Sequence, residues 1–101
     1  MKYSISWSAQ ALSDLQSIYD FIAQDSLYYA EAELVKIKLA TEILLNHVYA
    51  GRIVPEAGDK NTREIISGNY RIIYKISESE DVTVITIHHG ARLLMREDLS
   101  V

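Results

Sequence analysis

Apolar and polar residues alternate at the start of the chain, and the spacing then changes from that of a strand to that of a helix. Tyr3, Ile5 and Trp7 alternate with serines, so we predict a half-buried strand over residues 2–7. Ser8 has a side chain suited to cap a helix, and apolar residues then recur at helical spacing until about residue 24. They are Leu12, Leu15, Ile18 or Tyr19, and Ile22.

A second apolar stripe follows Ser26, which we expect to cap a second helix. The stripe consists of Ala30, Leu34, Ile37, Thr41, Leu44 and Val48. Its three- and four-residue spacing is helical. We predict that this helix ends near Tyr49, because glycine commonly terminates helices and Gly51 follows.

Three segments rich in Ile, Val, Tyr and Thr follow a loop that carries Gly51, Pro55 and Gly58. They span residues 63–67, 70–77 and 82–89. Their composition is typical of strands, and the short polar segments between them are typical of turns. The pattern predicts an antiparallel meander, followed by a tail from Gly90 to Val101 that forms a loop or a brief helical turn.

The predicted element order is β-α-α-β-β-β, which indicates an α+β two-layer sandwich. Two helices must bury their apolar stripes, and a four-stranded, mainly antiparallel sheet has one face to cover them. We therefore expect a single domain over residues 1–101, with a helix hairpin on one sheet face and the other face open until a partner covers it. In the strand at 70–77, the core-facing set would be Tyr70, Ile72, Tyr74 and Ile76, and the outward set Arg71, Ile73 and Lys75.

Composition narrows the function classes. The 101 residues carry a net charge of −4 and no cysteine, which excludes disulfides, thiolate metal sites and a cysteine nucleophile. No apolar run reaches the length of a membrane span or signal peptide, so we expect a cytoplasmic protein. The acidic total disfavours direct nucleic-acid binding. All five arginines nevertheless lie in the second half of the chain: Arg52, Arg63, Arg71, Arg92 and Arg96.

Short motifs occur along nearly the whole chain, in an order that is more specific than any one of them. They are Trp7, Ala11 with Asp14-Leu15, Ile18-Tyr19 and Ile22, Ala30, Gly51-Arg52, Val54-Pro55-Glu56, Arg63-Glu64, Tyr70-Arg71-Ile72 with Tyr74, and His88-His89-Gly90-Ala91-Arg92. This ordered set resembles the RelE/ParE superfamily of toxins from bacterial type II toxin–antitoxin modules, and within it the ParE-like branch. The proline that usually precedes the Gly-Arg pair is replaced here by Val48-Tyr49-Ala50, a departure that affects a loop.

The resemblance implies the fold derived above and adds a function, that of a small toxin which a cognate antitoxin protein holds inactive in a hetero-oligomer. ParE-like members poison DNA gyrase and are not known as enzymes, whereas RelE-like members are ribosome-dependent endoribonucleases. We favour the gyrase poison, with no catalytic residues, no cofactor and no metal. We expect its partner-binding surface to contain Arg52, Arg63, Arg71, Ile73, Lys75 and Arg92.

The alternative is the endoribonuclease, which needs a base for the 2′-OH, an acid for the leaving oxygen and a cation at the phosphorus. The residues that would have to supply these roles are Arg63, Arg71, His88, His89 and Arg92. Arginine meets only the last need, because it stays charged. His88 and His89 are neighbours on a strand, so at most one shares a face with Arg71. A second alternative is a binding module without toxicity.

Overall fold

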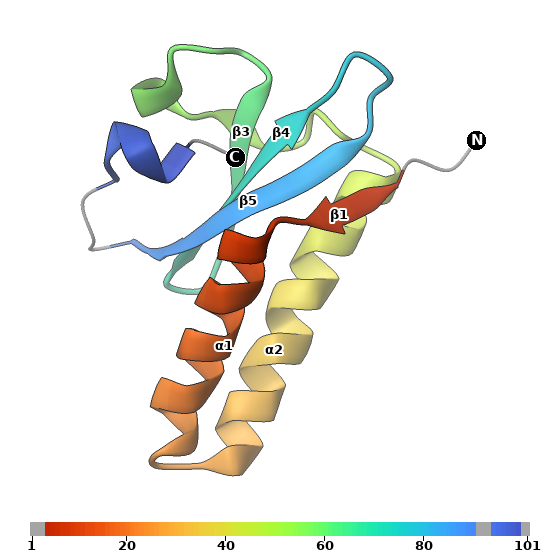
Figure 1. Ribbon diagram of the computed structural model, residues 1–101. Helices are drawn as coiled ribbons and strands as arrows, with labels where there is room; N and C mark the ends of the chain where they lie inside the picture. The colour runs from red at the N-terminus through yellow and green to blue at the C-terminus, as the bar shows by residue number, and fades with distance from the viewer. Residues whose placement is uncertain (1–3, 91–93, 100–101) are drawn as a thin grey trace.

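The described residues, 4–90 and 94–99 of the computed structural model, form two helices and a five-stranded sheet. The elements are β1 (Ile5–Trp7), α1 (Ala9–Ala23), α2 (Leu27–Glu42), β2 (Arg52–Ile53), β3 (Thr62–Ser67), β4 (Tyr70–Ile76), β5 (Val82–His89) and three short 3₁₀ helices, η1 (Ile43–Leu45), η2 (Pro55–Ala57) and η3 (Arg96–Leu99). The helices form a hairpin that packs on one face of the sheet and extends beyond it (Figure 1). The predicted α+β class is confirmed.

The sheet has the strand order β1-β5-β4-β3-β2, with one strand more than predicted. β1 runs parallel to β5, and the other neighbours are antiparallel. The additional strand is β2, which pairs with Arg63 and Glu64 of β3. We expected these two residues to lie in a loop, because so short a segment shows no alternation by which a strand is recognised. Tyr3, expected in the first strand, lies outside the described residues.

Both helices begin where the sequence predicts. Ser8 and Ser26 accept hydrogen bonds from the backbone three residues further on, at 3.0 and 3.2 Å. The predicted inner stripe is buried at Ala30, Ile37 and Thr41 of α2, and also at Leu44 of η1 and at Val48 after it. The prediction fails at Leu12, which is exposed while Ala11 is buried in its place, and at the end of α2, which stops at Glu42 and not near Tyr49. Among the described residues, no helix has the length and apolar character needed to cross a membrane.

Gly51 is buried where the chain packs closely against β3 and Tyr74, and it does not terminate a helix. A Cβ at this position would lie 2.5 Å from the carbonyl oxygen of Glu64 and 2.7 Å from the Tyr74 hydroxyl. The Gly51 N–H donates to the Tyr74 hydroxyl at 3.0 Å, and that hydroxyl donates to the Val48 carbonyl at 2.8 Å. Tyr74 therefore ties the segment between α2 and β2 to the centre of the sheet.

A β-bulge in β5 changes which side chains face the helices. Ile73 pairs with Thr86 whereas Tyr74 pairs with Val84, so Ile85 is the inserted residue. Val84 lies in the core beneath the helices, and Ile85 lies in a second core on the other side of the sheet. The bulge thus puts Ile87 back on the helix side and turns His88 away from it.

The sheet face opposite the helices is partly covered, although we expected it to be open. η2 and η3 lie over this face (Figure 1) and enclose a second core. Its buried members are Val54, Ile73, Ile85, Leu94 and Leu99. The expectation that Ile73 is available to a partner was therefore wrong. The tail supplies two leucines to this core, and their burial depends on long-range packing that strand alternation does not reveal.

Candidate functional site

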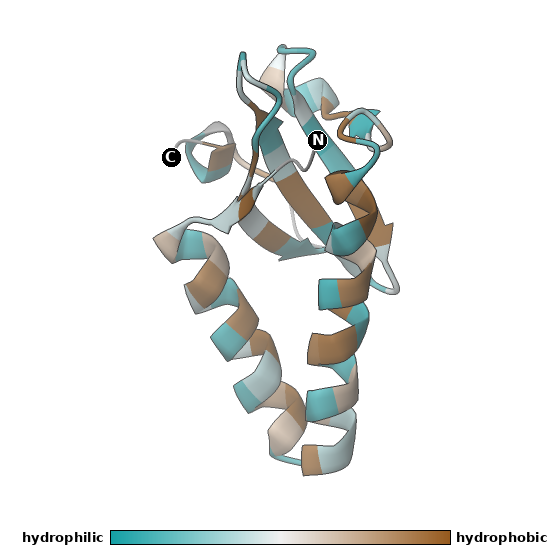
Figure 2. Ribbon diagram, turned by 90° about the vertical axis from the view of Figure 1, so that its right-hand side faces the viewer, coloured by the Kyte–Doolittle hydropathy of each residue, from teal (hydrophilic) through white to brown (hydrophobic). Residues whose placement is uncertain are grey.

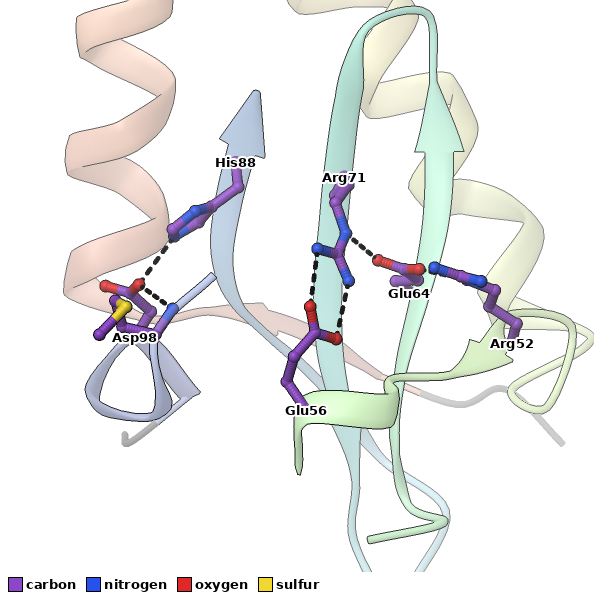
Figure 3. A network of polar contacts seen from close by, with 7 residues as sticks. Arg52, Glu56, Glu64, Arg71, His88 and Asp98 are labelled. Carbon is purple, nitrogen blue, oxygen red and sulfur yellow. Dashed lines mark hydrogen bonds and ion pairs between the residues drawn. The ribbon is translucent and has the colours of Figure 1, made fainter. Parts of the chain in front are cut away.

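A network of four charged side chains crosses the sheet face opposite the helices (Figure 3). Glu64 on β3 accepts hydrogen bonds from Arg52 on β2 and from Arg71 on β4. Arg71 also donates through both terminal nitrogens to Glu56 of η2, each at 3.3 Å. Two arginines and two glutamates balance one another, so the network carries no net charge.

Burial makes Glu64 the centre of this network. Its side chain is 0% exposed, against 13% for Arg71 and 64% for Arg52. A buried carboxylate is costly without cations and hydrogen bonds around it, and the two guanidinium groups supply both. Both arginines are therefore held by groups within this chain.

The electrostatics keep Arg71 and Glu56 ionised. Burial alone would lower the pKa of Arg71, but its hydrogen bonds with Glu56 and Glu64 outweigh burial and raise that pKa. The same contact, with Arg71 as donor, lowers the pKa of Glu56. Arg71 is consequently a permanent cation that already faces two carboxylates.

The strand register brings these residues together. Arg52 lies directly opposite Glu64 in the antiparallel pair of β2 and β3. Glu64 lies opposite Ile73, two residues along β4 from Arg71, and such diagonal neighbours share a face within reach of long side chains. Arg63 adjoins Glu64 along β3 and so points to the other side of the sheet.

Arg63 is held by backbone carbonyl groups and by an aromatic ring. Its Nη1 donates to the carbonyls of Gly51 at 3.0 Å and Tyr49 at 3.4 Å, and its Nε donates to that of Lys60 at 3.0 Å. The guanidinium carbon lies 5.0 Å from the centre of the Tyr49 ring, a cation–π distance. Arg63 therefore fastens the segment before β2 and takes no part in the Glu64 network.

The two histidines lie on opposite faces, as strand geometry predicts. His88 lies directly across from Arg71 in the register of β4 and β5. It is 2% exposed, and its Nε2 is 3.8 Å from a carboxylate oxygen of Asp98 in η3 (Figure 3). His89 is exposed on the helix side, where its ring meets Tyr70 edge to face at 5.6 Å.

The structure brings together only part of the expected partner-binding set. Arg52 and Arg71 share the Glu64 network, Arg63 is on the other side of the sheet, and Ile73 is in the second core. Lys75 is half-buried further along β4. Arg92 lies outside the described residues. Within residues 4–90 and 94–99, no group of three or more His, Asp or Glu side chains is placed to hold a metal ion.

Sequence reasoning missed three acidic residues with structural roles. Glu56 holds Arg71, and Asp98 accepts a hydrogen bond from the Met95 N–H at 2.9 Å in addition to facing His88. Asp14 of α1 accepts hydrogen bonds from the Thr86 hydroxyl at 2.5 Å and the Ile87 N–H at 3.0 Å. Asp14 and Glu56 belonged to motifs that carried the family resemblance, and those motifs gave no role for either carboxylate.

Comparison with known proteins adds a family to this description. The sequence model of a family described as the ParE toxin of the type II toxin–antitoxin system parDE matches residues 5–94. No sequence among curated proteins matches the chain.

Solved structures share the fold at low sequence identity. A chain of the chromosomal ParDE toxin–antitoxin system from P. aeruginosa has a TM-score of 0.71 at 17% identity, over 86% of this chain and 95% of that one. A chain of the RelBE2 toxin–antitoxin complex from Mycobacterium tuberculosis has a TM-score of 0.60 at 17% identity, over 88% of this chain and 99% of that one. A mutant of the E. coli toxin RelE in the free state has a TM-score of 0.63 at 17% identity, over 90% and 86%.

Proposed function

The chain belongs to the ParE family of toxins of type II toxin–antitoxin systems, and we propose that it arrests growth by binding DNA gyrase, without catalysis of its own. In this proposal a cognate antitoxin protein holds the toxin inactive in a hetero-oligomer. Support for the antitoxin comes from two similar folds that belong to a toxin–antitoxin system and a toxin–antitoxin complex.

The neutral Glu64 network is the observation that carries the choice of a protein target over RNA. A metal-independent ribonuclease needs uncompensated cations to stabilise the extra negative charge on the phosphorus. Arg52 and Arg71 instead face Glu64 and Glu56. An approaching phosphate would meet two carboxylates on the same face, and repulsion between like charges opposes its binding.

Proton transfer is the second difficulty for a nuclease. A general acid or base must come within hydrogen-bonding distance of the reacting group. His88 shares the face of Arg71 but is buried, with Asp98 of η3 beside it. His89 is exposed but lies on the helix side of the sheet, with Tyr70. On the sheet face that carries Arg71, the described residues thus place a charge-compensated cation beside a buried imidazole.

The ribosome-dependent endoribonuclease remains the second candidate, because Arg71 and His88 lie directly opposite each other on neighbouring strands. A cation and an imidazole at this spacing could act on one phosphodiester if η3 moved off the sheet. A binding module without toxicity is the third candidate.

Induced expression of the chain, followed by assays with purified components, separates the three. We expect growth arrest with a DNA damage response, relief of arrest by the co-expressed antitoxin, and inhibition of supercoiling by purified gyrase. Cleavage of ribosome-bound mRNA would overturn the proposal in favour of the nuclease. Unchanged growth, with the chain shown to be folded by circular dichroism, would favour the non-toxic module.

Two variants sharpen the comparison. His88→Gln removes the candidate acid–base group, so the proposal expects folded His88→Gln protein to inhibit gyrase as the unmodified chain does. A nuclease would lose mRNA cleavage with the same substitution. Arg71→Ala tests whether the network is part of the target surface, provided that folding of the variant is checked in parallel.

A further inference from the structure

Helix α2 is apolar on two opposite sides. Its inner stripe is buried against α1 and the sheet. A second stripe, spaced by four, three and four residues, consists of Tyr28, Ala32, Val35 and Leu39. At 3.6 residues per turn this outer stripe lies about half a turn from the inner one. Tyr28, Val35 and Leu39 are 74%, 57% and 60% exposed, although side chains of this kind are usually inside.

No other described element lies against the outer side of α2. The hairpin extends away from the sheet, with α1 on one side of α2 (Figure 1), and hydrophobic segments recur along the length of α2 (Figure 2). A helix exposed to water on one side normally carries polar residues there. A continuous exposed stripe along a helix is typical of a surface that packs against another protein.

We propose that the outer stripe of α2 is the interface of a homodimer, in which the α2 helices of two copies pack antiparallel about a two-fold axis. The spacing of the stripe matches the seam of two packed helices, in which apolar residues are three and four positions apart. In one antiparallel register Tyr28 meets Leu39 of the second copy, and Ala32 meets Val35 of the second copy. By symmetry each contact occurs twice, and in each layer a larger side chain faces a smaller one.

The charged residues beside the stripe favour the same register. Glu31 and Lys38 flank it on one side, both are exposed, and they lie two helical turns apart. In the antiparallel register Glu31 of each copy lies beside Lys38 of the other, which gives two intermolecular ion pairs. A parallel arrangement would instead bring this flank against the opposite flank of the second copy, so Glu31 and Lys38 would not meet. The charge order on this flank is therefore complementary to itself in the antiparallel pairing.

The interface is small, so the dimer is expected to be weak. One helix per copy contributes less surface than the roughly 800 Å² per partner of a standard interface. We expect a dissociation constant in the micromolar range.

The flanking charges also distinguish a second copy from a membrane surface. A helix that lies on a membrane carries mainly Lys and Arg on its polar side. The flank of α2 alternates acidic and basic residues, with Glu31, Lys38 and Glu42 in turn. This alternation matches a partner with the same alternation in reverse order, which an antiparallel second copy provides.

Sedimentation of the purified chain, separated from its antitoxin, tests the proposal over low to high micromolar concentrations. We expect a reversible monomer–dimer equilibrium that Leu39→Glu shifts to monomer. Glu31→Lys and Lys38→Glu should each weaken the dimer several-fold, and the double variant should restore it, because the swapped charges attract again. A monomer at all concentrations, or a swap without restoration, would overturn the proposal. If the chain is monomeric and Leu39→Glu instead abolishes antitoxin binding, the face belongs to the antitoxin.

Disulfide cross-linking tests the register, because the chain contains no cysteine. Under mild oxidation the Tyr28→Cys/Leu39→Cys double variant should form covalent dimers. Leu39→Cys alone should not, because the two copies of this position are about 16 Å apart along the helix axis in the antiparallel register. Efficient cross-linking of the single variant would contradict this arrangement. Circular dichroism of each variant shows whether the monomer fold is retained.

Discussion

Glu64 on β3 and Arg71 on β4 form an ion pair on the sheet face that η2 and η3 partly cover, and Arg52 completes the charge balance from β2. Replacing such a pair with apolar groups is often neutral, whereas removing one member leaves a buried charge without compensation. The pair is therefore better understood as fixing the positions of β2, β3, β4 and η2 than as a large source of stability.

Glu64→Gln is expected to lower the free energy of unfolding by about 2–3 kcal/mol, less than the loss of an isolated buried pair, because Arg71 retains Glu56. The double variant Glu64→Gln/Arg71→Gln should lose less than the sum of the two single variants, since neither charge then remains without its partner. Urea denaturation measures each value. Strict additivity would show that the two residues do not stabilise each other.

Tyr74→Phe tests the link between the sheet and the segment before β2. Removing the hydroxyl leaves the Val48 carbonyl and the Gly51 N–H without this buried partner, and we expect a loss of about 1–3 kcal/mol in the free energy of unfolding. Tyr29→Phe is the matched control, because Tyr29 is 66% exposed. Thermal or urea denaturation of both variants should show a loss only for Tyr74→Phe, and equal stability of the two would contradict the buried role of the hydroxyl.

Ionisation of Glu56 makes the free energy of unfolding depend on pH in the acidic range. The hydrogen bond from Arg71 lowers the pKa of Glu56 in the folded chain, so the unfolded chain binds the proton more readily. This contribution is present above the pKa of the unfolded glutamate and is lost as the pH falls through the folded value. Partial exposure of the Glu56 side chain, 37%, makes the contribution modest.

Urea denaturation from neutral to acidic pH measures this dependence. As the pH falls below the ordinary pKa of a glutamate, the free energy of unfolding of Glu56→Gln should decrease less steeply than that of the unmodified chain. Glu78→Gln is the control, because Glu78 is exposed in the turn after β4, and it should leave the slope unchanged. Equal slopes for all three proteins would show that the Arg71 contact does not persist in solution.

The features of the fold that depend on residues close together in the sequence could be predicted. Ser8 and Ser26 cap the helices because their hydroxyls satisfy nearby N–H groups. The strand at 82–89 has the predicted bounds, since its β-branched residues and flanking turns are local signals. β2 was not predictable in this way, because its pairing with β3 is what makes two residues a strand.

The candidate site could be predicted only in part. The alternation of side chains along a strand correctly predicts that His88 and His89 lie on opposite sheet faces. It also correctly places Arg71 on the face opposite the helices. The same rule puts Arg63 and Glu64 on opposite faces, although they are neighbours in the sequence. The contact of Glu56 with Arg71 depends on how η2 folds over the sheet, and the burial of His88 depends on η3. No local pattern encodes either approach.

Asp14 and Asp20 of α1 form a closely matched pair for comparing a buried contact with an exposed one. Asp14 and Asp20 both lie on α1, and each accepts a hydrogen bond at 2.8 Å from the glutamine four residues earlier. Asp14 alone of these two also accepts hydrogen bonds from Thr86 and Ile87, beside the bulge in β5.

We expect Asp14→Ala to lower the free energy of unfolding by about 2 kcal/mol, because a buried donor in β5 loses its acceptor. Asp20→Ala should change the free energy of unfolding by no more than about 0.5 kcal/mol. Urea denaturation gives both values, and amide hydrogen exchange at Ile87 should accelerate in Asp14→Ala only. Similar losses in the two variants would mean that the helix surface, and not the anchor to β5, determines the effect.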